Sequence, residues 1–504
     1  MSWRWGAPIL LFFTLLLVSV HLGLTDDEAY YWVLAQKPSW GYAYHPPMVA
    51  WWITLSERLL GIFGSRASVI AVRLPAAFLC AGLIVFSLKW LEAAAGRVTR
   101  SAVVLLLSFG GVFAFGWMMV PDLPLFFFWG ILFERTWRRT LSESTEFQWS
   151  DGWVLALASA GILLSKYSGV LALGSAGLSF LIFARGQART RGVMALVVGG
   201  ILAAIPILWW NSHHGWASLL YQFKERHGEF TFSGSRWARY WAIQSLLAGP
   251  AVFIFFLHLC FRPVRNRDRN LDYVLVWALP PALVFFTQAA FADFKPHWTL
   301  VVWWPVLLGL AYAEVKGSLG RPSRPGRLDR WASVQRIYGI ALMAVVYSSL
   351  QVPWIFWGLS RFTGKSTNPL MDVTNDLYGW SDLPQLLKDS GLQGLPVVGS
   401  RYQTAAQASF VLSGAAESRS ATLLPRDLKS LDEWPHLSIV DSQGPNWPSL
   451  AAPLLFVADQ RYSDGPEFKD AQCELRLTHQ ALRWGLPAKT LKVWKCVPFR
   501  PQAG

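Results

Sequence analysis

A succession of apolar segments constrains this chain more than any other feature. A helix that crosses a bilayer needs roughly 20 mostly apolar residues, with about 17 as a practical minimum. Eleven windows come near this length: 6–24, 67–90, 101–120, 122–137, 152–165, 167–184, 193–210, 240–261, 272–290, 298–315 and 332–359. Because 53% of the 504 residues are hydrophobic and only 15% are charged, the composition argues against a soluble enzyme. We predict a polytopic α-helical membrane protein with about eleven transmembrane helices.

Basic residues predict how these helices are oriented. If the N-terminus is cytoplasmic and all eleven windows span, every compact basic loop falls on the cytoplasmic side. These loops contain Lys89, Arg97 and Arg100; Arg135, Arg138 and Arg139; Arg185, Arg189 and Arg191; Arg262, Arg265, Arg267 and Arg269; and the linker "KGSLGRPSRPGRLDR". Merging the fifth and sixth windows, which only "SKYS" separates, would destroy this asymmetry, so two helices are predicted. The net charge of +14 then reflects topology, and no nucleic-acid partner is expected.

The first window is expected to be an uncleaved span rather than a signal peptide. The start "MSWRW" is basic, as in signal peptides, but no small-x-small cleavage site precedes the turn "HLGLTDDEAYYW".

The last part of the chain lacks long apolar windows and mixes polar with apolar residues. Residues 1–361 are predicted to form the transmembrane domain with its external loops, and residues 362–504 a periplasmic α/β domain. The second region contains strand-like runs, namely "LPVVG", "LSIVD", "LLFVAD" and "LKVWKCVPF". It also contains Cys473 and Cys496. An oxidising compartment would permit a bridge between these two thiols, but their spacing alone leaves the question open.

With this topology, acids, bases and cations gather on the external face. The first external loop holds Asp26, Asp27, Glu28, Tyr30 and His45. The later external turns hold Asp122, Lys166, His213, His214, Lys224, Arg226, His227, Asp293, Lys295 and His297. Fixed carboxylates with several cations at a bilayer surface suit a lipid-phosphate substrate, because the cations neutralise the phosphate and a carboxylate handles a proton or a metal.

Each of these residues also has a purely structural interpretation. The run "DDE" suits a helix N-cap and its acidic first turn. Lys166 suits an anchor near the end of a span, His45 a stiff turn before two prolines, and Asp122 a helix cap.

Six stretches, in this order, resemble bacterial glycosyltransferase family 39 proteins, which have the GT-C membrane fold. They are "DDEAYYW", "WGYAYHPPMVAWW", "VPDLPLFFFW", "LLSKYSGVLAL", "WWNSHHGWASLLYQF" and "DFKPHW", and they cover roughly residues 1–312. Relatives in this family include protein O-mannosyltransferases and transferases that add aminoarabinose or hexosamines to lipid A. The C-terminal region has no counterpart in the resemblance.

The resemblance implies inverting transfer of a sugar from a polyprenyl-phosphate carrier to an envelope acceptor at the periplasmic face of the inner membrane. The family's acidic pair falls on Asp27 and Glu28, which are the expected catalytic residues, with Asp27 as the base. Asp122 matches the second external acid, and Lys166 matches the lysine that contacts the phosphate. The remaining substrate-binding candidates are Asp26, Tyr30, His45, His213, His214, Lys295 and His297.

Several alternatives remain open at this point. The acceptor is expected to be lipid A or another glycolipid, with a polypeptide as the alternative. A transporter or flippase of lipid-linked sugars is the rival class, although it predicts charges near span centres rather than at external ends. A divalent cation is a possible cofactor, with Asp27, Asp122 and His45 as its candidate ligands. Tyr44 departs from the acid or small polar residue that many relatives carry before "HPP", which weakens the case for a metal at that turn.

Overall fold

The computed structural model describes residues 3–62, 68–142, 147–222, 231–263, 267–292, 295–320, 326–364, 368–413, 421–422, 453–463, 465–466 and 471–498. Contacts divide the chain into two compact units. The first comprises residues 1–17, 40–49 and 76–345, and the second residues 18–39, 50–75 and 346–504. Residues 18–39 therefore cluster with the C-terminal region. The predicted division between residues 361 and 362 stays a prediction.

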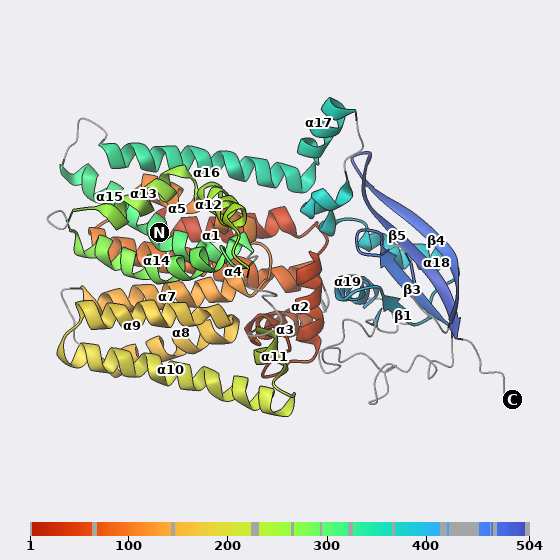
Figure 1. Cartoon of the computed structure of the whole chain (residues 1–504), viewed down its shortest axis with the longest axis horizontal. Helices are drawn as coiled ribbons and strands as arrows, with labels where there is room; N and C mark the ends of the chain where they lie inside the picture. The colour runs from red at the N-terminus through yellow and green to blue at the C-terminus, as the bar shows by residue number, and fades with distance from the viewer. Residues whose placement is uncertain are drawn as a thin grey trace. The chain divides into compact units, whose positions relative to one another are not determined.

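All eleven predicted windows are helical in the structure. The helices over them are α1 (Trp3–Ser19), α4 (Val69–Ala95), α5 (Arg100–Leu107), α6 (Gly110–Phe115), α7 (Asp122–Thr140), α8 (Trp149–Ser165), α9 (Val170–Phe183), α10 (Gly186–His213), α12 (Gly234–Ala248), α13 (Pro250–Phe261), α14 (Arg269–Gln288), α15 (Leu300–Gly320), α16 (Arg327–Gln351) and α17 (Trp354–Thr363). Helices α7, α8, α9 and α10 pack side by side (Figure 1). The predicted separation of the fifth and sixth windows is confirmed, because Lys166 adopts an extended conformation between α8 and α9.

Three windows predicted as single helices are broken. Window 101–120 divides at Ser108 into α5 and α6. Helices α12 and α13 meet at a bend of 110° at Gly249, whose φ of +83° a residue with a side chain rarely adopts. Helices α16 and α17 meet at 80° beside Pro353, which lacks the N–H that a continuous helix requires.

Among the residues that the structure describes, four helices are long and apolar enough to cross a membrane by themselves. Counting each bent pair as one span raises the number to as many as six. Helices α1, α8 and α9 contribute shorter apolar segments. The number of eleven spans therefore stays a prediction, while the helical character of the windows is established.

The second unit contains a five-stranded mixed sheet in the order β2-β1-β3-β5-β4. Strands β1, β3, β5 and β4 are labelled in Figure 1. Its strands are β1 (Val397–Gly399), β2 (Ala421–Thr422), β3 (Leu454–Asp459), β4 (Ala471–Arg483) and β5 (Leu486–Pro498). Strand β1 pairs in parallel with β2 and β3, whereas β5 is antiparallel to both β3 and β4. Three of the predicted strand-like runs lie in β1, β3 and β5; the run "LSIVD" lies outside the described residues. The sequence did not predict β4.

Strand β3 runs through the core of this sheet. Leu455 and Val457 pack into one apolar cluster with Trp380, while Leu454 and Phe456 pack into a second cluster. Since side chains alternate across a strand, burial of all six residues of β3 means that both faces of the sheet are covered.

The described part of the second unit also contains helices α2 (Asp26–Gln36), α3 (Met48–Gly61, in part), α18 (Leu383–Asp389) and α19 (Tyr402–Leu412). Helix α19 packs against α2 through two pairs of aromatic rings, Tyr30 with Tyr402 and Trp32 with Phe410. The segment that the sequence analysis placed in the first external loop is thus helical over Asp26–Gln36, as the structural interpretation of the run "DDE" expected.

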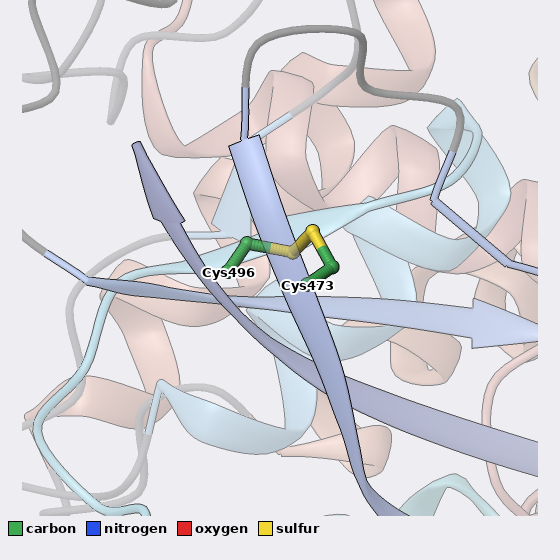
Figure 2. Close-up of a disulfide and its surroundings, with 2 residues drawn as sticks. All are labelled: Cys473 and Cys496. Carbon is green, nitrogen blue, oxygen red and sulfur yellow. A yellow bond between two sulfur atoms is a disulfide. The ribbon is translucent and has the colours of Figure 1, made fainter. Parts of the chain in front are cut away.

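A disulfide joins Cys473 in β4 to Cys496 in β5 (Figure 2). The two residues are directly opposite each other in the antiparallel pairing of β4 with β5. The structure thereby resolves the pairing that the sequence left open.

Candidate functional site

The acidic run at the start of α2 has a clear local cause. Thr25 is the N-cap, and its hydroxyl accepts a hydrogen bond from the backbone N–H of Glu28 at 3.2 Å. In return, the Glu28 carboxylate accepts the backbone N–H of Thr25 at 3.0 Å. This reciprocal pair is a capping box, which satisfies two donors that a helix start would otherwise leave open. The cap is therefore Thr25, and neither aspartate of the run serves as the N-cap.

Glu28 is also half of a buried ion pair. Arg73, in the first turns of α4, donates to it from Nε at 3.0 Å and from Nη2 at 2.7 Å, and both side chains are fully buried. The same guanidinium donates to the carbonyls of Leu22 at 3.0 Å and Gly23 at 2.7 Å, and to that of Ser19. Arg73 thus ties the segment before α2 to α4. Arg73 was not predicted as a functional residue, since an arginine inside an apolar window indicates no partner.

The Asp26 carboxylate is held by the C-terminal region. It accepts hydrogen bonds from the Tyr462 hydroxyl at 2.5 Å and from Gln407 Nε2 at 2.9 Å, and Arg461 Nη2 lies 3.5 Å away. Burial and the negative charge of Asp26 raise the pKa of Tyr462, so the phenol stays protonated and donates.

Arg461 belongs to a larger buried cluster of charges. Its guanidinium is bonded to Asp459 at 2.7 and 2.9 Å and also to Asp376. Lys489 Nζ lies 3.7 Å from Asp459. Burial, together with repulsion from Asp26, raises the pKa of Asp376, and burial lowers the pKa of Lys489. Sequence reasoning missed this cluster, because its members are up to 463 positions apart and match no short motif.

Asp27 lies between these two restrained acids. It is half-buried in the first turn of α2, preceded by Asp26 with its C-terminal partners and followed by Glu28 with Arg73. Tyr30, one turn further on, is buried and packs against the rings of Tyr31 and Tyr402.

In the first unit, a second group of predicted residues comes together around Asp122. Lys166 Nζ donates to Asp122 Oδ1 at 2.7 Å, and both residues are 7% exposed. Asp122 opens α7 after Pro121, while Lys166 occupies the break between α8 and α9. His45 and His297 lie near enough to interact electrostatically with the Asp122 carboxylate. The Lys166 ammonium also lies 5.3 Å from the ring centre of Trp298, within range of a cation–π interaction.

The other predicted residues are placed differently. The rings of His213 and His214 each donate from Nδ1 to a carbonyl one turn back in α10, at 2.8 Å to Trp209 and at 2.7 Å to Trp210. Lys295 is exposed at the start of the short 3-10 helix Pro296–Thr299. Four further residues of the predicted external face lie outside the described residues: Lys224, Arg226, His227 and Asp293.

The predicted metal ligands are Asp27, Asp122 and His45. Within the described ranges, no group of three or more histidine, cysteine, aspartate or glutamate side chains is arranged to hold a metal ion. Asp122 already carries the Lys166 ammonium at 2.7 Å, and that positive charge would repel a cation. One oxygen of the Asp122 carboxylate is therefore bonded to a cation, and a role for Asp122 as a metal ligand stays a prediction.

Comparison with known proteins gives a relative by sequence. The chain is 26% identical over 316 residues to the lipid A galacturonosyltransferase RgtD of Rhizobium johnstonii. The match covers 60% of this chain and 64% of that protein, so the chain matches just under two thirds of the length of its relative. A scan against protein-family models finds none that matches.

Comparison with solved structures gives the fold. ArnT from Cupriavidus metallidurans in the apo state matches with a TM-score of 0.59 and 12% identity, over 96% of this chain and 97% of that one. The same protein bound to undecaprenyl phosphate matches with a TM-score of 0.60 and 13% identity, over 97% and 96%. The chain therefore has an ArnT-like GT-C fold along nearly its whole length. The predicted resemblance to GT-C glycosyltransferases is confirmed by the two comparisons together.

Proposed function

We propose that this chain, with its ArnT-like fold, is an inverting glycosyltransferase. It moves a sugar from an undecaprenyl-phosphate carrier to lipid A or another glycolipid at the periplasmic face of the inner membrane. The observation that carries the proposal is the sequence match to a lipid A galacturonosyltransferase. The ArnT structure with bound undecaprenyl phosphate supports the choice of carrier.

The chemistry is a single displacement at the anomeric carbon. An acceptor oxygen forms a bond to that carbon while the bond to the carrier phosphate breaks, and the phosphate leaves with the bonding electron pair. Negative charge grows on the phosphate, so positioned cations lower the barrier. We assign this task to Lys166, with Lys295 and His297 as further candidates. An ammonium has three N–H donors, and Asp122 accepts from one of them while orienting the side chain.

Asp27 is the proposed catalytic residue on the acceptor side. A hydroxyl acceptor has a pKa far above neutrality, and Asp27 would remove its proton as general base. A phosphate acceptor, such as that of lipid A, arrives ionised, and Asp27 would then orient it or stabilise the positive charge developing on the sugar ring. Glu28 shares the predicted acidic motif, although its carboxylate is already bonded to Arg73 and Thr25.

A divalent cation stays a proposal, with Asp27, Asp122 and His45 as its candidate ligands. Turnover measured in EDTA, and again after addition of Mg²⁺ or Mn²⁺, determines whether the reaction depends on one.

Mass spectrometry of lipid A and envelope glycans tests the proposed function. We expect a deletion strain to lack one sugar mass on lipid A or another glycolipid, and a complemented strain to regain it. The missing mass would identify the sugar as a hexose, hexosamine, pentosamine or uronic acid. Unchanged glycolipids together with a lost protein glycan would instead favour the polypeptide-modifying alternative.

Reporter fusions test the proposed topology. With a cytoplasmic N-terminus and eleven spans, fusions at Gly320 and Gly504 should report opposite sides of the membrane, because the two points are separated by one span. The Cys473–Cys496 disulfide supports a periplasmic C-terminal domain, since such bridges persist in oxidising compartments. Fusions that report the same side would show that the span count is wrong.

A further inference from the structure

The carboxylate of Asp26 is fully engaged by residues more than 380 positions away in the sequence. Its Oδ1 accepts from Gln407 in α19, and its Oδ2 accepts from Tyr462, with Arg461 at 3.5 Å. Asp26 is 4% exposed. A substrate would have to displace these donors to reach it, so its predicted role as a direct substrate ligand is not what this geometry favours.

The donors themselves are held firmly by the C-terminal core. Arg461 is bonded to Asp459, which is fully buried and is the last residue of the central strand β3. Gln407 donates a second hydrogen bond to the carbonyl of Leu24 at 2.9 Å. The start of α2 is therefore bonded to α19 and to the segment that follows β3.

Asp27 is restrained from both sides as a result. Asp26 precedes it and is fastened to the C-terminal region, and Glu28 follows it and is fastened to Arg73 and Thr25. A reacting group must be held close to its productive position, and a misplacement of about 1 Å can cost about 100-fold in rate.

We propose that Tyr462, Arg461 and Gln407 are positioning residues, which hold Asp26 and thereby fix the turn of α2 that carries Asp27. The C-terminal domain then contributes to catalysis by positioning Asp27. This inference rests on the proposed catalytic role of Asp27, and the measurements below separate the two.

The charges of the cluster make a clean test possible. With all groups ionised, Asp26, Asp376 and Asp459 face two cations, Arg461 and Lys489. Neutralising Asp26 leaves two carboxylates and two cations. If Asp26 only balances charge inside the domain and does not position Asp27, Asp26→Asn should be tolerated, with turnover unchanged.

We expect Asp26→Asn and Tyr462→Phe to lower kcat by about 10- to 100-fold, the scale of a small misplacement. The KM for the polyprenyl-phosphate sugar should stay at the parental value, because neither residue is assigned to donor binding. Both variants should be assayed as full-length protein in nanodiscs, and the thermal unfolding temperature should remain near that of the parent.

Asp372→Asn is the matched control. This buried carboxylate of the same domain lies 3.3 Å from Arg483 and accepts from the backbone N–H of Thr374, and it has no hydrogen bond to Asp26. It should leave kcat unchanged. Loss of kcat in this control equal to that in Tyr462→Phe would overturn the inference, because any disturbance of the domain would then suffice.

The double variant Tyr462→Phe/Asp27→Asn supplies a readout that general damage would not reproduce. If Tyr462 acts through Asp27, the double variant should be no slower than Asp27→Asn alone. Additive losses would overturn the inference, and so would parental kcat in Tyr462→Phe and Asp26→Asn beside an inactive Asp27→Asn. An active Asp27→Asn would instead refute the catalytic role itself.

Discussion

Replacing Asp27 by asparagine is expected to lower turnover by roughly two to four orders of magnitude, the usual scale for loss of a general base. The substitution keeps the shape of the side chain and removes its charge. Thr25 rather than Asp27 caps α2, so the helix start keeps its hydrogen bonds. The measurement is turnover of purified protein in nanodiscs with a polyprenyl-phosphate sugar and the acceptor.

A matched control for this experiment is Asp389→Asn. Asp389 is exposed at the end of α18, where its carboxylate accepts from Gln385. It should retain parental turnover. Near-parental turnover in a well-folded Asp27→Asn would refute the catalytic assignment of Asp27.

Replacing Arg73 by methionine is expected to destabilise the protein by about 3–5 kcal/mol, because it leaves the Glu28 carboxylate buried without its cation. It also removes the donors to the carbonyls of Ser19, Leu22 and Gly23. The measurement is the thermal unfolding temperature in detergent, together with the amount of protein recovered from the membrane. Parental values for both would show that the ion pair contributes little.

The double variant Arg73→Met/Glu28→Gln separates stability from catalysis. Since it removes the uncompensated charge, it should recover part of the lost stability. Glu28 is also one of the two residues predicted to be catalytic. If Glu28 is catalytic, the double variant should be folded but inactive. Parental turnover would show that Glu28 serves only the capping box and the ion pair.

The helical windows were predictable from the sequence because a run of about 20 apolar residues has few alternatives to a buried helix. The same is true of β3, whose run "LLFVAD" is apolar enough to be covered on both faces. The bends at Gly249 and Pro353 were not predicted, although glycine and proline were visible there. Apolar windows measure hydrophobicity over many residues, whereas a bend depends on one backbone conformation.

Some features of the candidate site could also be predicted from the sequence. Local sequence determined the capping box, because Thr25 and Glu28 are three positions apart on one helix start. The family motifs pointed to Asp122 and Lys166, and the structure brings these two within 2.7 Å. The capping box and the family motifs both lie in short stretches of sequence, so the spacing of residues along the chain is enough to predict them.

By itself, then, the sequence determined that the chain is rich in apolar helices, where those helices lie, and which short motifs carry acids and cations. Only the tertiary structure decided the partners of those acids: Arg73 for Glu28, and Tyr462, Gln407 and Arg461 for Asp26. The physical reason is that a buried charge must find a partner wherever the fold supplies one. Such a partner can be 45 or 436 positions away, as Arg73 and Tyr462 are, and no periodicity along the chain records it.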